Sequence, residues 1–164
     1  MFDEFLANNA DYASRFAHAG MTPQVAKGLC VVTCMDTRID PLAILGLAVG
    51  DSKILRNAGG RVTPDVLRSL VLATNFLGVE AVAVMHHAGC ALAGSDDDKL
   101  NDALSQDQRD ATAGWAWLSM PDPDAALADD VATVRSCAGL AKGVTVEGWR
   151  YDVETGLVAR VIRA

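Results

Sequence analysis

The sequence has little positive charge, and this limits its partners. It holds 14 Lys and Arg against 21 Asp and Glu, which gives a formal net charge of −7. Because binding to nucleic-acid phosphates requires a basic face, this balance argues against a nucleic-acid partner. No apolar run reaches the roughly 18 residues of a membrane-spanning helix. Asp3 and Glu4 replace the basic segment that opens a signal peptide, so we expect a cytoplasmic protein that binds no membrane.

The chain also lacks internal repeats, low-complexity tracts and a linker rich in Pro, Gly or Ser. Its 164 residues are enough to bury a sizeable core, and we interpret residues 1–164 as a single domain. Hydrophobic residues make up 51% of the chain and charged residues only 21%. Such a composition is typical of an α/β core covered on both sides, and it also fits a buried subunit interface.

Strand-like and helix-like segments alternate along the chain. The apolar runs at 28–33, 53–56 and 79–85 predict buried strands, because they are continuous and do not alternate with polar residues. Helices are expected at 2–19, 41–49, 63–77 and 122–135, with partly helical structure over 95–112 and a closing hairpin from 144–152 and 157–162. This alternation indicates an α/β fold with a mostly parallel sheet, whose first three strands would lie in the order 2-1-3.

Chemically reactive side chains follow two of these strands. Cys34, Asp36 and Arg38 come after the first, and His87 and Cys90 come after the third. The first and third strands would be neighbours about 4.8 Å apart, so both clusters should meet at the carboxyl edge of the sheet. Two thiols and one imidazole form a ligand set that favours Zn²⁺, and three protein ligands leave a position open for water. We therefore expect a zinc lyase or hydrolase that acts on a very small substrate.

Other residues close to these clusters have alternative interpretations. His86 is a rival to His87 as a ligand, although a position in the core or behind the ligands is favoured. We interpret Cys30 and Cys137 as small buried core residues and expect no disulfide. Residues 57–60 could form only a tight turn, but their place after the second strand favours backbone amides near the site.

The sequence resembles the β-carbonic anhydrases, and above all their small, compact bacterial members. The first cluster matches that family's Cys-x-Asp-x-Arg motif and the second its His-x-x-Cys motif. The likeness covers nearly the whole chain and includes Arg56-Asn57-Ala58-Gly59-Gly60 and Val146-Glu147-Gly148-Trp149-Arg150-Tyr151-Asp152. The resemblance implies a mostly parallel central sheet of order 2-1-3-4 with an antiparallel edge strand, flanked by helices. It also implies a homodimer or homotetramer with its site near the subunit interface.

The resemblance assigns roles to the reactive residues. Cys34, His87 and Cys90 would hold zinc, and Asp36 with Arg38 would form the catalytic pair. The implied reaction is the reversible hydration of carbon dioxide to bicarbonate and a proton by zinc-bound hydroxide. Asp36 would orient the zinc-bound water, while Arg38 keeps that carboxylate ionised and aimed. In the family, Asp36 can instead leave Arg38 and bind zinc at lower pH.

Three backbone groups complete the expected site. We assign substrate binding to Gly59, Gly60 and Ala91, whose backbone amides would lie close to the zinc-bound anion.

The sequence departs from the family at the rim of the site. Ala88, Gly89 and Ala91 stand where the family usually has Thr, Asp and Gly. The change makes the rim less polar and favours, as an alternative, a carbonyl sulfide or carbon disulfide hydrolase on the same fold. A non-catalytic zinc or redox sensor is a further alternative. A nucleotide-binding domain is disfavoured, since the glycines do not form a G-x-G-x-x-G motif.

Overall fold

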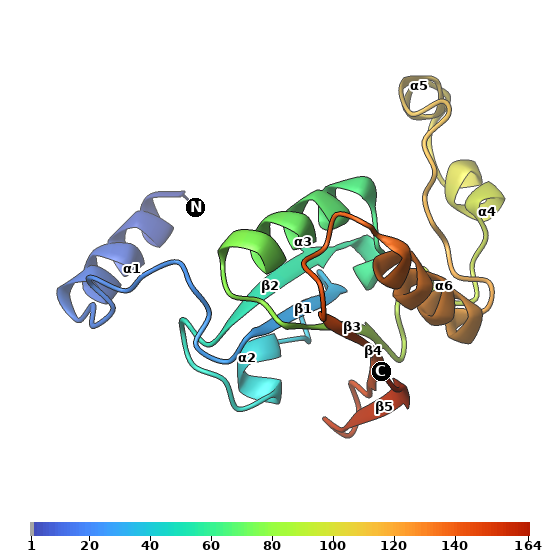
Figure 1. Ribbon diagram of the computed structural model, residues 1–164. Coiled ribbons are helices and arrows are strands. Elements are labelled where there is room, and N and C mark those ends of the chain that lie inside the picture. Colours follow the sequence, from blue (N-terminus) through green and yellow to red (C-terminus); the bar gives the residue numbers. More distant parts are fainter. Residues whose placement is uncertain (1) are drawn as a thin grey trace.

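The fold is built on one five-stranded sheet, shown in Figure 1 as a computed structural model that describes residues 2–164. The strand order is β2-β1-β3-β4-β5. The strands are β1 (Leu29–Cys34), β2 (Ser52–Asn57), β3 (Ala81–His87), β4 (Thr145–Tyr151) and β5 (Val158–Ile162). The first four run parallel, and β5 is antiparallel to β4. This confirms the predicted α/β fold, its strand order and its antiparallel edge strand.

Helices flank the sheet, with α3 and α6 over one face and α2 on the other (Figure 1). The helical segments are α1 (Phe2–Ser14), α2 (Pro41–Ile44), the 3₁₀ turn η1 (Ala58–Gly60), α3 (Pro64–Phe76), α4 (Asp97–Asp102), α5 (Gln106–Ala111) and α6 (Pro123–Ser136). Over residues 2–164, no helix combines the length and apolar character needed to cross a membrane. Asp40 and Thr63 cap α2 and α3, and each is followed by a proline at the first helical position.

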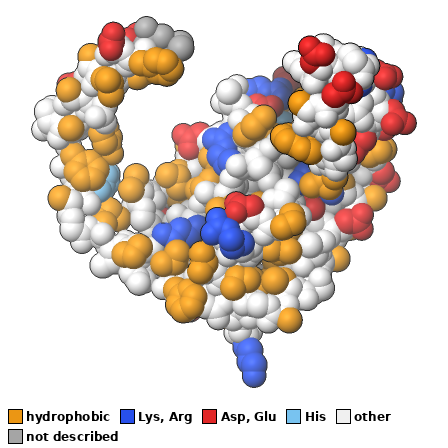
Figure 2. Space-filling view, turned by 90° about the horizontal axis from the view of Figure 1, so that it is seen from above, with side chains coloured by type: hydrophobic (Ala, Val, Ile, Leu, Met, Phe, Trp, Pro, Cys, Tyr) orange, Lys and Arg blue, Asp and Glu red, His pale blue; other side chains and the backbone are white. Residues whose placement is uncertain are grey.

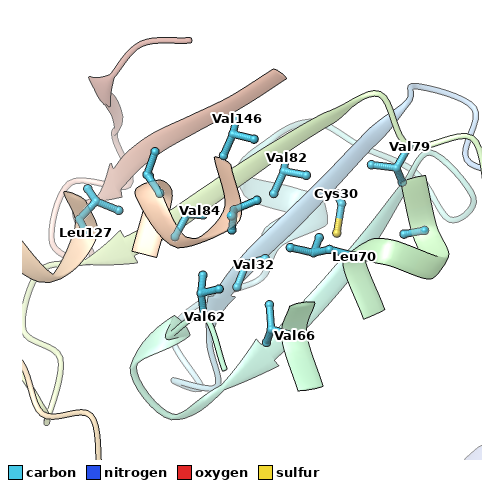
Figure 3. Packing of buried hydrophobic residues seen from close by; sticks show 13 residues of the cluster. Cys30, Val32, Val62, Val66, Leu70, Val79, Val82, Val84, Leu127 and Val146 are labelled. Carbon is cyan, nitrogen blue, oxygen red and sulfur yellow. The ribbon is translucent and has the colours of Figure 1, made fainter. Parts of the chain in front are cut away.

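The main core lies between the sheet and the helices α3 and α6 (Figure 3). Strand residues such as Val32 and Val84 pack there against Leu70 of α3 and Leu127 of α6, all fully buried. Cys30 belongs to this cluster as predicted, and burial raises the pKa of its thiol to about 12. All four cysteines are free, as expected.

Several predicted boundaries were wrong, and one difference matters for the site. β3 continues to His87 because its pairing with β4 extends through His86 and His87. The expected helix at 41–49 ends at Ile44, since Gly46 has a positive φ of 62° and turns the chain there. Cys137 ends α6 and is half-buried, so the prediction of a core position for it was wrong.

The opening helix stands apart from the rest of the chain. α1 is shorter than the expected 2–19 and has no buried residue. Its apolar side chains are exposed, with Phe2 at 75% and Leu6 at 67% of their maximal surface. Figure 2 shows these hydrophobic side chains along an arm that is separated from the body of the molecule by an open space. Within the described chain, therefore, nothing covers the apolar face of α1.

The turn after β2 comes unusually close to the end of β1. In η1, Gly59 has φ +74° and Gly60 has φ +68°, a left-handed conformation that favours glycine. A Cβ atom at Gly60 would lie 2.9 Å from both the nitrogen of Cys34 and the carbonyl carbon of Thr33. Because both atoms belong to the backbone of a central strand, no side-chain movement could relieve this contact.

We expect Gly60→Ala to destabilise the protein much more than Gly94→Ala. Gly94 has the same φ of +68°, but no atom lies within 4 Å of the Cβ it would gain. Gly94→Ala should therefore lower the free energy of unfolding by backbone strain alone, about 1 kcal/mol. Gly60→Ala adds a clash with the backbone of β1 and should lower it by about 3 kcal/mol or more. Denaturant unfolding of both variants measures the difference, and equal losses would contradict the close approach.

Candidate metal centre

Three potential metal ligands meet at the carboxyl edge of the sheet. Cys34 ends β1, His87 ends β3, and Cys90 lies three residues farther on in the following turn. Their ligand atoms all lie within 4.8 Å of one another, and all three residues are buried. A tetrahedral zinc ion at ordinary bond lengths would separate such atoms by about 3.5–3.8 Å. The structure thus brings together the three residues expected to hold a metal, close enough that small movements of the side chains would let all three bind one ion.

The His87 ring is oriented as a ligand. Its Nδ1 lies 2.9 Å from the carbonyl oxygen of Ala88, which can only accept a hydrogen bond. The proton therefore belongs on Nδ1, and Nε2 is left with a free lone pair. Nε2 is buried without a hydrogen-bond partner, an arrangement that costs free energy unless another group satisfies it. Burial lowers the pKa of His87, so the ring is neutral near pH 7, as metal binding requires.

Burial opposes ionisation of the Cys90 thiol. It raises the pKa of this thiol, and the neighbouring Cys34 acts in the same direction. A thiolate at this position would be desolvated, so the Cys90 thiol stays protonated near pH 7 unless a cation lies beside it. A bound divalent cation reverses that balance and releases the protons. The donor set and its burial therefore fit zinc.

Asp36 and Arg38 form a bidentate ion pair beside these ligands. The Arg38 Nε donates to Asp36 Oδ1 at 2.9 Å, and its Nη2 donates to Oδ2 at 2.7 Å. The Arg38 backbone N–H also donates to Oδ1 at 2.9 Å. These hydrogen bonds hold the pKa of Asp36 well below its usual range, so the carboxylate is ionised. Its Oδ2 lies 3.8 Å from Nε2 of His87, close to where a metal would sit.

Sequence reasoning gave no role to Arg56, which supports the same loop from β2. Its Nε donates to the carbonyl oxygen of Cys34 at 3.0 Å, and its Nη2 donates to that of Asp36 at 2.7 Å. The loop is therefore held from two sides, by Arg56 through its backbone and by Arg38 through the Asp36 carboxylate. The available signal was the position of Arg56 near the carboxyl end of the strand adjacent to β1.

A cavity of ≈ 470 Å³ opens beside the three ligands. Its wall consists of Cys34, Met35, Asp36, Thr37, Arg38, Ala58, Gly59, Cys90, Ala91 and Leu92. Apart from Asp36, Thr37 and Arg38, the side chains on this wall are apolar or contain sulfur. Gly59 and Ala91, to which substrate binding was assigned, lie on this wall. Gly60 does not, because it is buried behind the wall against the end of β1.

His86 faces away from the three ligands. Its Nε2 lies 3.0 Å from Oδ2 of the buried Asp130 on α6, and its ring is almost fully buried. His86 is therefore not one of the converging candidate ligands, and its burial agrees with the position in the core that was one of the two favoured for it. Because consecutive residues of a strand point to opposite faces, the approach of His86 to α6 places His87 on the side of the site.

Comparison with known proteins agrees with this geometry. Residues 29–120 match the sequence profile of the family described as carbonic anhydrase. The chain is 33% identical over 159 residues to "Beta-carbonic anhydrase 1" of Mycobacterium tuberculosis, covering 97% of this chain and 96% of that protein. It is 34% identical over 148 residues to "Carbon disulfide hydrolase" of Acidithiobacillus thiooxidans, covering 78% of this chain and 74% of the relative.

Structural similarity extends over the same length. The crystal structure of a carbonic anhydrase from Streptococcus mutans superposes with a TM-score of 0.90 at 34% sequence identity, covering 98% of this chain and 96% of that one. With the family profile, the relatives and the fold in agreement, this chain belongs to the β-carbonic anhydrase family.

Proposed function

We propose that this protein catalyses the reversible hydration of carbon dioxide to bicarbonate and a proton at a zinc ion held by Cys34, His87 and Cys90. The observation that carries the proposal is the convergence of the three ligand atoms within 4.8 Å around an unpartnered His87 Nε2. The Mycobacterium tuberculosis and Streptococcus mutans relatives, both named carbonic anhydrases, support the choice of reaction.

A zinc ion at these ligands would lower the pKa of a water in its open position and so supply a nucleophile near neutral pH. Because two thiolates donate more negative charge than two imidazoles, this water is less acidic than one at a three-histidine site. The ionised Asp36 carboxylate is close enough to the ligands to accept a hydrogen bond from that water and aim its lone pair at carbon dioxide. Arg38 binds both oxygens of this carboxylate and would thereby restrain it from binding the metal itself.

The walls of the cavity would receive the product. Gly59 and Ala91 line the cavity, where their backbone amides are the expected hydrogen-bond donors to bicarbonate. Gly60 would act indirectly, since its missing side chain lets the turn pack against Cys34. We infer a cytoplasmic location because all four cysteines are free, as is usual in reducing compartments.

A carbon disulfide or carbonyl sulfide hydrolase is the second candidate, favoured by the apolar wall of the cavity. Met35, Ala58, Ala91 and Leu92 contribute only apolar side chains to it. The Acidithiobacillus thiooxidans relative is named a carbon disulfide hydrolase. Its sequence identity of 34% is close to the 33% of the Mycobacterium tuberculosis relative, although the match covers 78% of this chain instead of 97%. Both substrates are linear, small and less polar than bicarbonate, so the same nucleophile could attack either of them.

We also infer that the active protein is a homodimer or homotetramer. The apolar face of α1 has no cover within the described chain, and it includes Phe2, Phe5 and Leu6. A monomer seldom exposes such a row of large apolar side chains. A second copy of the chain would bury them, since the arm formed by α1 stands away from the body of the molecule and leaves this face accessible (Figure 2).

We expect Asp36→Asn to reduce kcat/KM for carbon dioxide hydration by a factor of about 10²–10⁴, because the water loses its oriented acceptor. Zinc content, measured by atomic emission, should stay at one ion per chain. Asp40→Asn is the matched control, since Asp40 lies four residues later and caps α2 outside the cavity. Unchanged hydration by zinc-loaded Asp36→Asn would contradict the proposed role and favour a non-catalytic zinc or redox sensor.

A paired assay distinguishes the two candidate reactions. Stopped flow measures the hydration of carbon dioxide, and headspace analysis measures the hydrolysis of carbonyl sulfide and carbon disulfide. We expect wild-type hydration to be the faster reaction. Ala88→Thr, Gly89→Asp and Ala91→Gly together restore the family's more polar rim, and should raise the ratio of hydration to sulfide hydrolysis by about tenfold. Hydration near background beside rapid sulfide turnover would instead establish the second candidate.

For the oligomer, we expect Phe5→Glu combined with Leu6→Glu to lower the mass measured by light scattering to that of a monomer, because the interface would have to bury two carboxylates. Ala7→Glu is the control, since helical geometry turns Ala7 away from the face shared by Phe5 and Leu6. The control should keep the wild-type mass. An unchanged mass of the double variant would show that α1 does not hold the copies together.

A further inference from the structure

One buried carboxylate connects the two halves of the metal centre. Asp130 of α6 is 4% exposed and accepts hydrogen bonds from Arg61 Nε at 2.6 Å, His86 Nε2 at 3.0 Å and the Val62 backbone N–H at 3.1 Å. Burial by itself raises the pKa of Asp130, but the hydrogen bonds from His86, Arg61 and Val62 outweigh it and the pKa lies below its usual value. Asp130 is therefore a fixed negative charge with all its donors in place.

The first connection runs through β3 to the histidine ligand. His86 and His87 are consecutive residues at the end of the strand, so their rings lie on opposite faces of the sheet. The hydrogen bond to Asp130 holds the His86 ring against α6. Since the two rings share one short stretch of backbone, fixing the His86 ring also limits how far the strand end that carries His87 can turn.

The second connection runs through the turn after β2 to the first cysteine ligand. Arg61 and Val62 directly follow Gly60, whose backbone lies against Thr33 and Cys34. Asp130 binds both of them, and Arg61 extends the contact by donating from Nη1 to the carbonyl oxygen of Leu118 at 2.6 Å. These hydrogen bonds hold the turn close to α6, and they thereby keep its backbone against the end of β1, where Cys34 lies.

We propose that Asp130 is a positioning residue for the metal centre: by holding His86 on one side and Arg61 with Val62 on the other, it fixes the separation of His87 from Cys34. This inference rests on the proposed function, since it requires a metal ion at those two ligands and Cys90. Asp130 is neither one of the three candidate ligands nor part of the cavity wall, so it would act on the ligands through the backbone segments that carry them.

The test is the zinc affinity of Asp130→Asn, measured by competition with a chromophoric chelator. The amide has the same shape but loses the charge, and it cannot accept from all three donors. We expect zinc to bind about 10-fold more weakly, at the lower end of the range for residues that orient metal ligands. Cobalt substitution gives a second readout, because the absorption bands of the cobalt–thiolate centre should shift if the ligand geometry relaxes.

The matched control is Asp97→Asn. Asp97 also accepts three hydrogen bonds, from the Trp117 N–H at 3.2 Å, the Ser119 N–H at 3.2 Å and the Ser119 hydroxyl. These donors lie between α5 and α6, in a stretch of the chain that supplies none of the proposed ligands. The control should lose stability without losing zinc affinity or changing the cobalt spectrum.

Two variants of His86 keep the test informative should Asp130→Asn fail to fold. His86→Leu removes the hydrogen bond while Arg61 and Val62 still satisfy Asp130, and it should weaken zinc binding like Asp130→Asn. His86→Gln places an amide donor near the position of Nε2 and should restore most of the affinity. If His86 had only a steric role, His86→Leu and His86→Gln should change the zinc affinity to the same extent.

The outcomes separate this inference from the proposed function. A wild-type protein that binds no zinc would overturn the proposed function itself. A wild-type protein that binds zinc tightly, together with Asp130 and His86 variants that bind it as tightly as Asp97→Asn, would overturn only the role of Asp130. Equal weakening in all variants, the Asp97 control included, would also overturn it, because the effect would then follow from general destabilisation.

Discussion

The parallel pairing of β1 with β3 determines where two of the three candidate metal ligands, Cys34 and His87, lie. The two strands align from Leu29 opposite Ala81 to Thr33 opposite Met85, and the buried Thr33 hydroxyl donates to the Met85 carbonyl at 2.8 Å. Cys34 lies one residue after Thr33 on β1, and His87 lies two residues after Met85 on β3. In a sheet, a shift of register by one residue reverses the direction of each side chain. A one-residue slip of β1 against β3 would therefore turn one of these ligands into the core.

Because this pairing depends on long apolar runs, most of the fold could be predicted from the sequence. Continuous β-branched segments predicted the central strands, and the glycine-bounded alternation with helices predicted their parallel order. The ends of elements were harder, because they depend on contacts distant in the sequence. β3 continues to His87 only since β4, more than fifty residues later, extends the ladder through Arg150 and Tyr151. The early end of α2 depends on which of two glycines, Gly46 or Gly50, turns the chain first.

The candidate site also has a part that could be predicted from the sequence and a part that could not. The predictable part consists of reactive residues at or just after a strand end, namely Cys34, Asp36, Arg38, His87 and Cys90. The residues that hold these in place could not be predicted. Arg56 and Asp130 are charged residues without a local motif, and they act through backbone carbonyls and buried donors that only the folded chain brings close. The exposed face of α1 could not be predicted for a different reason. An amphipathic pattern predicts that the apolar face of a helix is buried, but it does not say whether the same copy of the chain or another one covers that face.

The hydrogen bonds of Arg38 show how the altered rim affects the centre. Besides both oxygens of Asp36, this guanidinium binds the carbonyl oxygen of Gly89 at 3.0 Å, so it links the loop after β1 to the turn after β3. A Cβ at Gly89 would lie 3.8 Å from the Arg38 Nη1, close enough for an acidic side chain there to share the guanidinium. With glycine at this position, Asp36 is the one carboxylate within ion-pair distance of Arg38 among residues 2–164. If Asp36 turned toward a metal ion at the three candidate ligands, the whole pair would break and Arg38 would keep the Gly89 carbonyl alone. This loss would favour the arrangement in which Asp36 stays paired with Arg38.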